Sequence, residues 1–138
     1  MKKLSLLFLL TFITLCSGQT PQKLKTQSFK ITQTECIKKK GFRLQLKSVI
    51  ADSRCPEGVD CIWAGEVKIV VMVYKDRKFL NETTMTVSSK QLAENTAWFS
   101  KYVPLGKKNI KNISVFPYPK EGNPIDPKAY YIKIDYLK

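Results

Sequence analysis

Several short segments of this chain alternate between apolar and polar residues. Phe42, Leu44 and Leu46 are separated by polar residues, which is the period-two pattern of a strand with one buried face. The alternation slips by one position before Val49. Because a β-bulge inserts one extra residue into a strand, the slip predicts a bulge near residues 47–48.

The longest apolar run lies in the middle of the chain. Residues 67–74 are apolar except for Lys68, which predicts a central strand covered on both faces. Residues 75–78 are polar and predict a turn, and residues 79–87 then form the returning strand of a β-hairpin. Leu80 is expected on one face of the returning strand. The residues expected together on its other face are Phe79, Met85 and Val87.

The remaining segments predict further short strands at residues 28–34, 110–116 and 130–137, and a turn at residues 38–41. Ser88 and Gln91 have the spacing of a capping box, which is compatible with one or two turns of helix and equally with a turn. An aromatic-rich strand or strap is expected at Trp98, Phe99, Tyr102 and Val103.

These segments amount to six or seven short strands and at most one short helix. No amphipathic helix separates the strands, which disfavours a parallel α/β sheet. The pattern predicts an all-β fold, a single antiparallel β-sandwich or small barrel.

The first 18 residues have the pattern of a secretory signal peptide. Two lysines precede an apolar stretch at residues 4–15, and Cys16 and Gly18 supply small residues before a cleavage point at Gln19. We therefore expect an exported protein, periplasmic or secreted. Lipid anchoring at Cys16 is a less favoured alternative, because Leu15 departs from the small residue that lipoprotein processing requires. After cleavage, a flexible tether at residues 19–27 would lead into one domain at residues 28–138.

The chain is strongly basic, with 24 basic and 11 acidic residues and a net charge of +13. Without Lys2 and Lys3, 22 basic and 11 acidic residues remain, a net charge of +11. Such a charge serves solubility or attracts anionic lipid head groups and polysaccharides; we favour the first interpretation and expect no nucleic acid partner. The clustered lysines are Lys38, Lys39, Lys40, Lys107, Lys108 and Lys111.

The cysteines fit an oxidising compartment. Cys55 and Cys61 enclose five residues that include Pro56 and Gly58, so we predict a disulfide, which would stabilise the fold by about 2.4 kcal/mol in the chain-entropy model. Cys36 is left either as a buried small hydrophobic residue or as a free thiol that pairs between chains. The chain has no histidine and no Cys-x-x-Cys pair, so we expect no metal site and no cofactor.

We also expect structural roles for several residues around this cysteine pair. Trp63 is expected in the core, packed on the disulfide, with an exposed binding residue as the alternative. Gly65 is expected in a backbone conformation that other residues avoid, and Asp52 at an Asx-turn. Arg54 is expected either to pair with Glu66 or to stack on Trp63.

The segment from Asp52 to Gly65 contains Asp-Ser-Arg-Cys-Pro followed by Cys-Ile-Trp-Ala-Gly. With a late Pro117-Tyr118-Pro119 segment and Tyr130, it resembles a signature of small exported bacterial proteins, many of them predicted lipoproteins. The resemblance spans residues 42–138. It implies an exported β fold with a disulfide, and it implies no catalytic residue.

The absence of histidine removes Ser-His-Asp and Cys-His catalysis, and no glycine-rich phosphate loop is present. The sequence therefore predicts a non-enzymatic, monomeric binding or accessory protein of the bacterial envelope. Its partner would be a protein or an anionic envelope component. The candidate binding residues are Arg54, Glu57, Asp60, Trp63 and the clustered lysines.

The alternative is an inhibitor or immunity-type protein. It would present the disulfide-closed loop from Arg54 to Trp63 to a secreted hydrolase, and the disulfide would keep the ordering cost of binding low.

Overall fold

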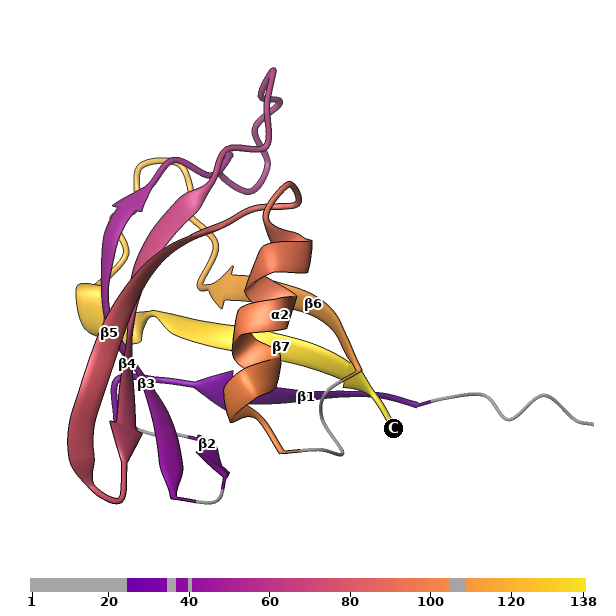
Figure 1. The fold of residues 1–138 in the computed structure, drawn as a ribbon. Helices are drawn as coiled ribbons and strands as arrows, with labels where there is room; N and C mark the ends of the chain where they lie inside the picture. The colour runs from indigo at the N-terminus through magenta and orange to yellow at the C-terminus, as the bar shows by residue number, and fades with distance from the viewer. Residues whose placement is uncertain (1–24, 35–36, 40, 105–108) are drawn as a thin grey trace, which may run out of the picture.

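The computed structural model describes residues 25–34, 37–39, 41–104 and 109–138, which form two antiparallel sheets (Figure 1). One sheet has the order β1-β7-β6, with strands β1 (Thr26–Ile31), β6 (Ile110–Phe116) and β7 (Tyr131–Leu137). The other has the order β2-β3-β4-β5, with strands β2 (Ile37–Lys39), β3 (Phe42–Asp52), β4 (Val67–Lys75) and β5 (Lys78–Val87). The predicted antiparallel β fold is confirmed, and it is a sandwich, since the described strands close no barrel.

The core lies between the two sheets, whose strands cross at a steep angle (Figure 1). Leu44 and Leu46 are fully buried, as the period-two pattern predicts. The predicted bulge is also confirmed, because the register of β3 against β4 shifts between Leu46 and Ser48. The fully buried side chains of the core are Ile31, Leu44, Leu46, Val67, Ile69, Val71, Val73, Phe99, Val103, Val115, Ile132 and Ile134.

The β4–β5 hairpin forms where the sequence predicts it, and Lys75 pairs with Lys78 across its two-residue turn. The expected position of Phe79 on the face of Met85 and Val87 is wrong, because Phe79 is 57% exposed. The reason is a register shift in which Leu80 is the extra residue. A single inserted residue reverses the side-chain alternation on one side of the bulge.

The segment expected as an aromatic strand or strap is helical. Helix α2 (Leu92–Tyr102) is longer than the one or two turns considered for this region. Trp98 and Tyr102, four residues apart, pack in a tilted arrangement with ring centroids 4.9 Å apart, and Phe99 enters the core. The spacing of four residues places the rings of Trp98 and Tyr102 next to each other on the helix. The capping box is not formed as expected, since α2 begins after Gln91 without a side-chain cap.

Two boundary predictions are also wrong. The first strand begins at Thr26, inside the expected tether, and ends at Ile31. The residues expected to form a turn at 38–39 belong to β2, which pairs with β3. A short 3-10 helix, η3 (Pro127–Ala129), precedes β7.

The predicted signal peptide, its cleavage point, Cys16, Cys36, Lys40, Lys107 and Lys108 lie outside the described residues. Within the described part of the chain, no helix has the length and apolar character needed to cross a membrane.

Candidate functional site

The loop that connects β3 to β4, residues 53–66, projects beyond both sheets (Figure 1). We call it the disulfide loop. Its two sides are joined at the base, because the backbone N–H of Ser53 donates to the carbonyl of Glu66 at 2.9 Å and that of Cys55 to Ala64 at 3.1 Å. The Ser53 hydroxyl also donates to the Glu66 carbonyl at 3.0 Å.

The predicted disulfide between Cys55 and Cys61 is present, with the two Cα atoms 6.0 Å apart. Between the cysteines, the N–H of Val59 donates to the Pro56 carbonyl at 3.3 Å, which closes a turn. Gly58 in this turn has a φ of 84°. The loop is thus closed at its base by backbone hydrogen bonds and farther out by the covalent bond.

Gly65 has the special conformation that its position predicts, with a φ of 69°. A Cβ atom built on Gly65 would lie 1.9 Å from the carbonyl oxygen of Ser53. Only glycine fits here, because both the positive φ and the close approach of the opposite side exclude a side chain.

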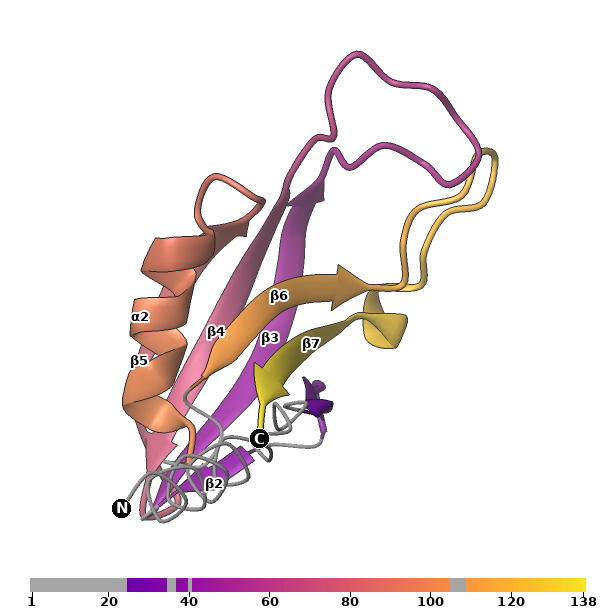
Figure 2. The ribbon, with the colours of Figure 1, turned by 90° about the vertical axis from the view of Figure 1, so that its right-hand side faces the viewer.

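A second loop, residues 117–126 after β6, lies beside the disulfide loop (Figure 2). We call it the β6–β7 loop. The N–H of Glu57 donates to the carbonyl of Pro119 at 2.9 Å. Lys120 approaches the Glu57 carboxylate at 3.9 Å, but both side chains are largely exposed, so this ion pair adds little. At this point the backbone hydrogen bond, rather than the ion pair, joins the two loops.

Arg54 holds the base of the disulfide loop from inside and is only 8% exposed. Its Nε donates to Asp52 Oδ1 at 2.7 Å and its Nη2 to Asp52 Oδ2 at 2.5 Å, a bidentate pair. The backbone N–H of Arg54 also donates to Asp52 Oδ1 at 3.2 Å, which confirms the predicted Asx-turn. A paired and hydrogen-bonded guanidinium is the form in which a buried arginine is tolerated.

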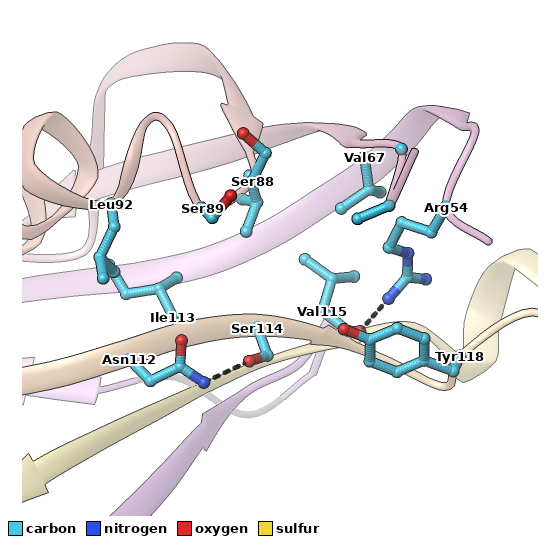
Figure 3. Close-up of a pocket in the computed structure, with 13 residues that line it drawn as sticks. Arg54, Val67, Ser88, Ser89, Leu92, Asn112, Ile113, Ser114, Val115 and Tyr118 are labelled. Atoms are coloured by element: carbon cyan, nitrogen blue, oxygen red, sulfur yellow. Dashed lines mark hydrogen bonds between the residues drawn. The ribbon is translucent and has the colours of Figure 1, made fainter. Parts of the chain in front are cut away.

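The same guanidinium connects the loop to the other sheet. It donates to the carbonyl of Val115 in β6 (Figure 3) and, at 2.9 Å, to that of Pro117. It lies 4.6 Å from the centre of the Tyr118 ring. Neither expected partner of Arg54 is found, since Asp52 takes the place of Glu66 and Tyr118 the place of Trp63.

The charges in this cluster shift two pKa values. Burial raises the pKa of Asp52, but the hydrogen bonds and positive charge of Arg54 outweigh it and hold that pKa below its ordinary value. The hydroxyl of Tyr130 donates to Asp52 Oδ2 at 3.1 Å. Burial and the neighbouring Asp52 carboxylate raise the pKa of Tyr130. The cluster is therefore an ionised pair with a neutral phenol, an arrangement that fixes the loop.

The outer part of the disulfide loop is apolar and exposed. Trp63 is 79% exposed, Ile62 is fully exposed and Val59 is at the edge of exposure. The expected core position of Trp63 is therefore wrong, and its alternative, an exposed residue, is what the structure shows. Glu57 and Asp60 are exposed on the same loop. We call Val59, Ile62 and Trp63 the apolar tip.

Two shallow hollows lie beside this loop. One, of about 510 Å³, runs from Trp63 to the Ser88–Lys90 turn. The other, of about 300 Å³, lies between Arg54, Leu92 and the outer edge of β6 (Figure 3). Both are open to solvent and carry no cluster of catalytic groups, so the projecting loop is the more distinctive feature of this end.

The candidate binding residues predicted from the sequence lie in different parts of the fold. Glu57, Asp60 and Trp63 share the exposed part of the disulfide loop, while Arg54 is buried and supports it. Lys38 and Lys39 are in β2, at the opposite end of the four-stranded sheet (Figure 1), and Lys111 is exposed in β6.

Sequence reasoning offered Trp63 as a binding candidate but missed its exposed neighbours Val59 and Ile62 and the partners of Arg54. Tyr118 appeared in it only as part of the motif resemblance, and Tyr130 appeared there and as the start of the last predicted strand.

Comparisons of the chain with family models, curated proteins and solved structures gave no match.

Proposed function

We propose that this protein is a non-enzymatic binding or accessory protein of the bacterial envelope and that the apolar tip is its contact with a protein partner. The observation that carries the proposal is the exposure of Trp63 and its neighbours on a loop closed by a disulfide and a buried ion pair. Tryptophan is among the residues enriched at the energetic centres of protein interfaces. A loop already ordered before binding loses little conformational entropy on association.

Two further observations support the proposal. The disulfide suits an oxidising compartment, as does the signal-peptide pattern of the first 18 residues. Exposed apolar side chains gathered at one place on a soluble domain often mark an interaction site. The acidic residues Glu57 and Asp60 beside the tip favour a partner surface that is apolar at its centre and basic around it.

Site-specific photo-crosslinking tests the proposal. A photoreactive residue at position 62 should capture a defined envelope protein in the bacterium, and Trp63→Ser should abolish that product. The matched control places the same residue at position 50, because Ile50 is 60% exposed but lies on β3 away from the tip. The same products from both positions, or none from position 62, would remove the apolar tip as a binding site.

The second candidate is an inhibitor or immunity-type protein, and the projection of the disulfide loop beyond both sheets favours it (Figure 2). In this version the apolar tip enters the cleft of a secreted hydrolase. Purified protein would be assayed against a panel of proteases and muramidases. Inhibition that Trp63→Ser removes would select this candidate, and no inhibition at micromolar protein would end it.

A further inference from the structure

The end of the four-stranded sheet opposite the disulfide loop is basic. Phe42 pairs with Lys39 on one side and with Lys75 on the other, and the N–H of Asp76 donates to the carbonyl of Gly41 at 2.9 Å. Gly41 and the β4–β5 turn are therefore side by side. We call this surface the basic end; its basic residues are Arg43, Lys75, Arg77 and Lys78.

Among the described residues of this surface, Asp76 is the acidic one, so four bases accompany one acid. The opposite end of the molecule has the reverse charge balance. The disulfide loop, Asp52 and the β6–β7 loop together carry two bases, Arg54 and Lys120. Their acids are Asp52, Glu57, Asp60, Glu66, Glu121 and Asp126. The two groups lie at opposite ends of the molecule (Figure 2). Such a separation orients a protein in the field of an anionic surface.

Exposed apolar side chains adjoin the bases. Phe79, 57% exposed, and Leu80, 50% exposed, follow Lys78 directly. The Phe79 ring meets Tyr74 edge-on at 6.0 Å. Bases together with exposed apolar residues suit the boundary between lipid head groups and acyl chains. A dissolved polyanion would neutralise the lysines but would offer no apolar phase for Leu80, so this combination favours a bilayer.

The position of the first strand agrees with this orientation. Thr26, where β1 begins, pairs with Leu137 near the end of β7. The end of the chain after β7 lies in the half of the molecule away from the disulfide loop (Figures 1 and 2). Lys25, whose carbonyl accepts from the N–H of Lys138 at 3.1 Å, therefore lies in the half that carries the basic end.

We propose that the basic end docks on an anionic lipid bilayer, with Phe79 and Leu80 at the head-group boundary and the disulfide loop directed away from the membrane. The proposal goes beyond the protein-binding function of the apolar tip and stands without it, because it uses a different surface. It would leave the apolar tip free for a partner while the domain is held at the membrane.

Vesicle binding by the chain from Gln19 onward tests the position of the contact. Vesicles of phosphatidylglycerol and phosphatidylcholine should bind the protein at low salt, and phosphatidylcholine vesicles should not. Each lysine close to an anionic bilayer strengthens binding about fivefold, so Lys75→Gln with Lys78→Gln should weaken it about thirtyfold. The matched control, Lys68→Gln with Lys128→Gln, removes the same charge from exposed positions outside the basic end and should change binding less than fivefold.

The contact of Phe79 and Leu80 with the bilayer is tested by separate measurements. A tryptophan placed by Phe79→Trp should be quenched by brominated acyl chains, whereas Trp63 in the unsubstituted protein should not be. Leu80→Ser should weaken vesicle binding but leave binding to heparin unchanged. Equal losses from both lysine pairs, quenching of Trp63, or an unaltered vesicle affinity after Leu80→Ser would each overturn the proposal. None of these results bears on crosslinking from position 62, so this proposal and the proposed function fail separately.

Discussion

The two ends of the four-stranded sheet both expose apolar side chains, but they hold them differently. Trp63 and Ile62 are on a long loop without regular structure, fixed by a disulfide, a buried ion pair and hydrogen bonds to the β6–β7 loop. Phe79 and Leu80 are at the end of a hairpin, beside the exposed bases Lys75, Arg77 and Lys78. A rigid, shaped tip suits a protein surface, whereas bases and apolar side chains on a hairpin suit a deformable bilayer.

The disulfide loop depends on the buried contacts of Arg54 and on the close approach of its two sides at Gly65. Substitutions at these positions should therefore lower the free energy of unfolding more than substitutions at exposed positions.

The largest effect is expected from Arg54→Met. Removing one partner of a buried ion pair costs about 3–5 kcal/mol, since Asp52 would keep a buried charge without its partner. The matched control is Lys47→Met, because Lys47 pairs with Glu82 at 2.6 Å while both side chains are about half exposed. That substitution should cost less than about 1 kcal/mol. Urea unfolding measures both, and equal losses would show that the buried pair does not support the loop.

A smaller effect is expected from Gly65→Ala. A left-handed conformation costs a non-glycine residue about 1–3 kcal/mol, and here the new methyl group would also meet the Ser53 carbonyl. We expect a loss of about 3 kcal/mol. Gly58→Ala is the control, because Gly58 also has a positive φ but nothing lies within 4 Å of its Cβ position; it should lose about 1 kcal/mol. Indistinguishable thermal stabilities would show that the two sides of the loop do not approach as described.

The lowered pKa of Asp52 predicts a loss of stability in acid. The unfolded chain takes up the proton first, near the ordinary value of 3.8, and the folded protein takes it up only at lower pH. The contribution of Asp52 is thus fully present above that value and lost as pH falls through the lower folded pKa. Unfolding free energies measured from pH 6 to pH 2 should fall more steeply for the unsubstituted protein than for Asp52→Asn. Parallel curves would contradict this assignment.

The smallest effect is expected from Trp63→Ala. Because the side chain is exposed, its removal should change the unfolding free energy by less than about 0.5 kcal/mol. Phe99→Ala, in the core, should cost about 3–5 kcal/mol. A comparable loss at Trp63 would mean that the ring packs against the domain and that the apolar tip does not exist in solution.

Local patterns in the sequence were sufficient to predict most of the strands. The alternation around Leu44 and Leu46 and the apolar run of β4 depend only on neighbouring residues, and both strands form as predicted. The disulfide could also be predicted, because its cysteines are close in sequence. The continuation of helix α2 through Trp98 and Tyr102 was missed, because closely spaced aromatic residues suit a strand as well as a helix.

The contacts of the site depend on residues far apart. The carbonyl that accepts from Arg54 belongs to Val115, 61 residues away, and no periodicity signals such a pair. Trp63 was misplaced because a large apolar residue after a cysteine gives no sign of facing outward. The charge separation was hidden for the same reason, since Arg43 and Lys75 come together only through the pairing of β3 with β4.

The proposed contact with a partner requires Trp63 to be exposed on a loop that is already ordered. Time-resolved fluorescence anisotropy of the Trp98→Phe variant, in which Trp63 is the remaining tryptophan, tests this requirement most directly. We predict a ring that acrylamide quenches freely and whose anisotropy decays mainly with the tumbling of the whole domain. Reduction of the Cys55–Cys61 bond should add a fast component. A fast decay already present in the oxidised protein, or a ring shielded from acrylamide, would contradict the account.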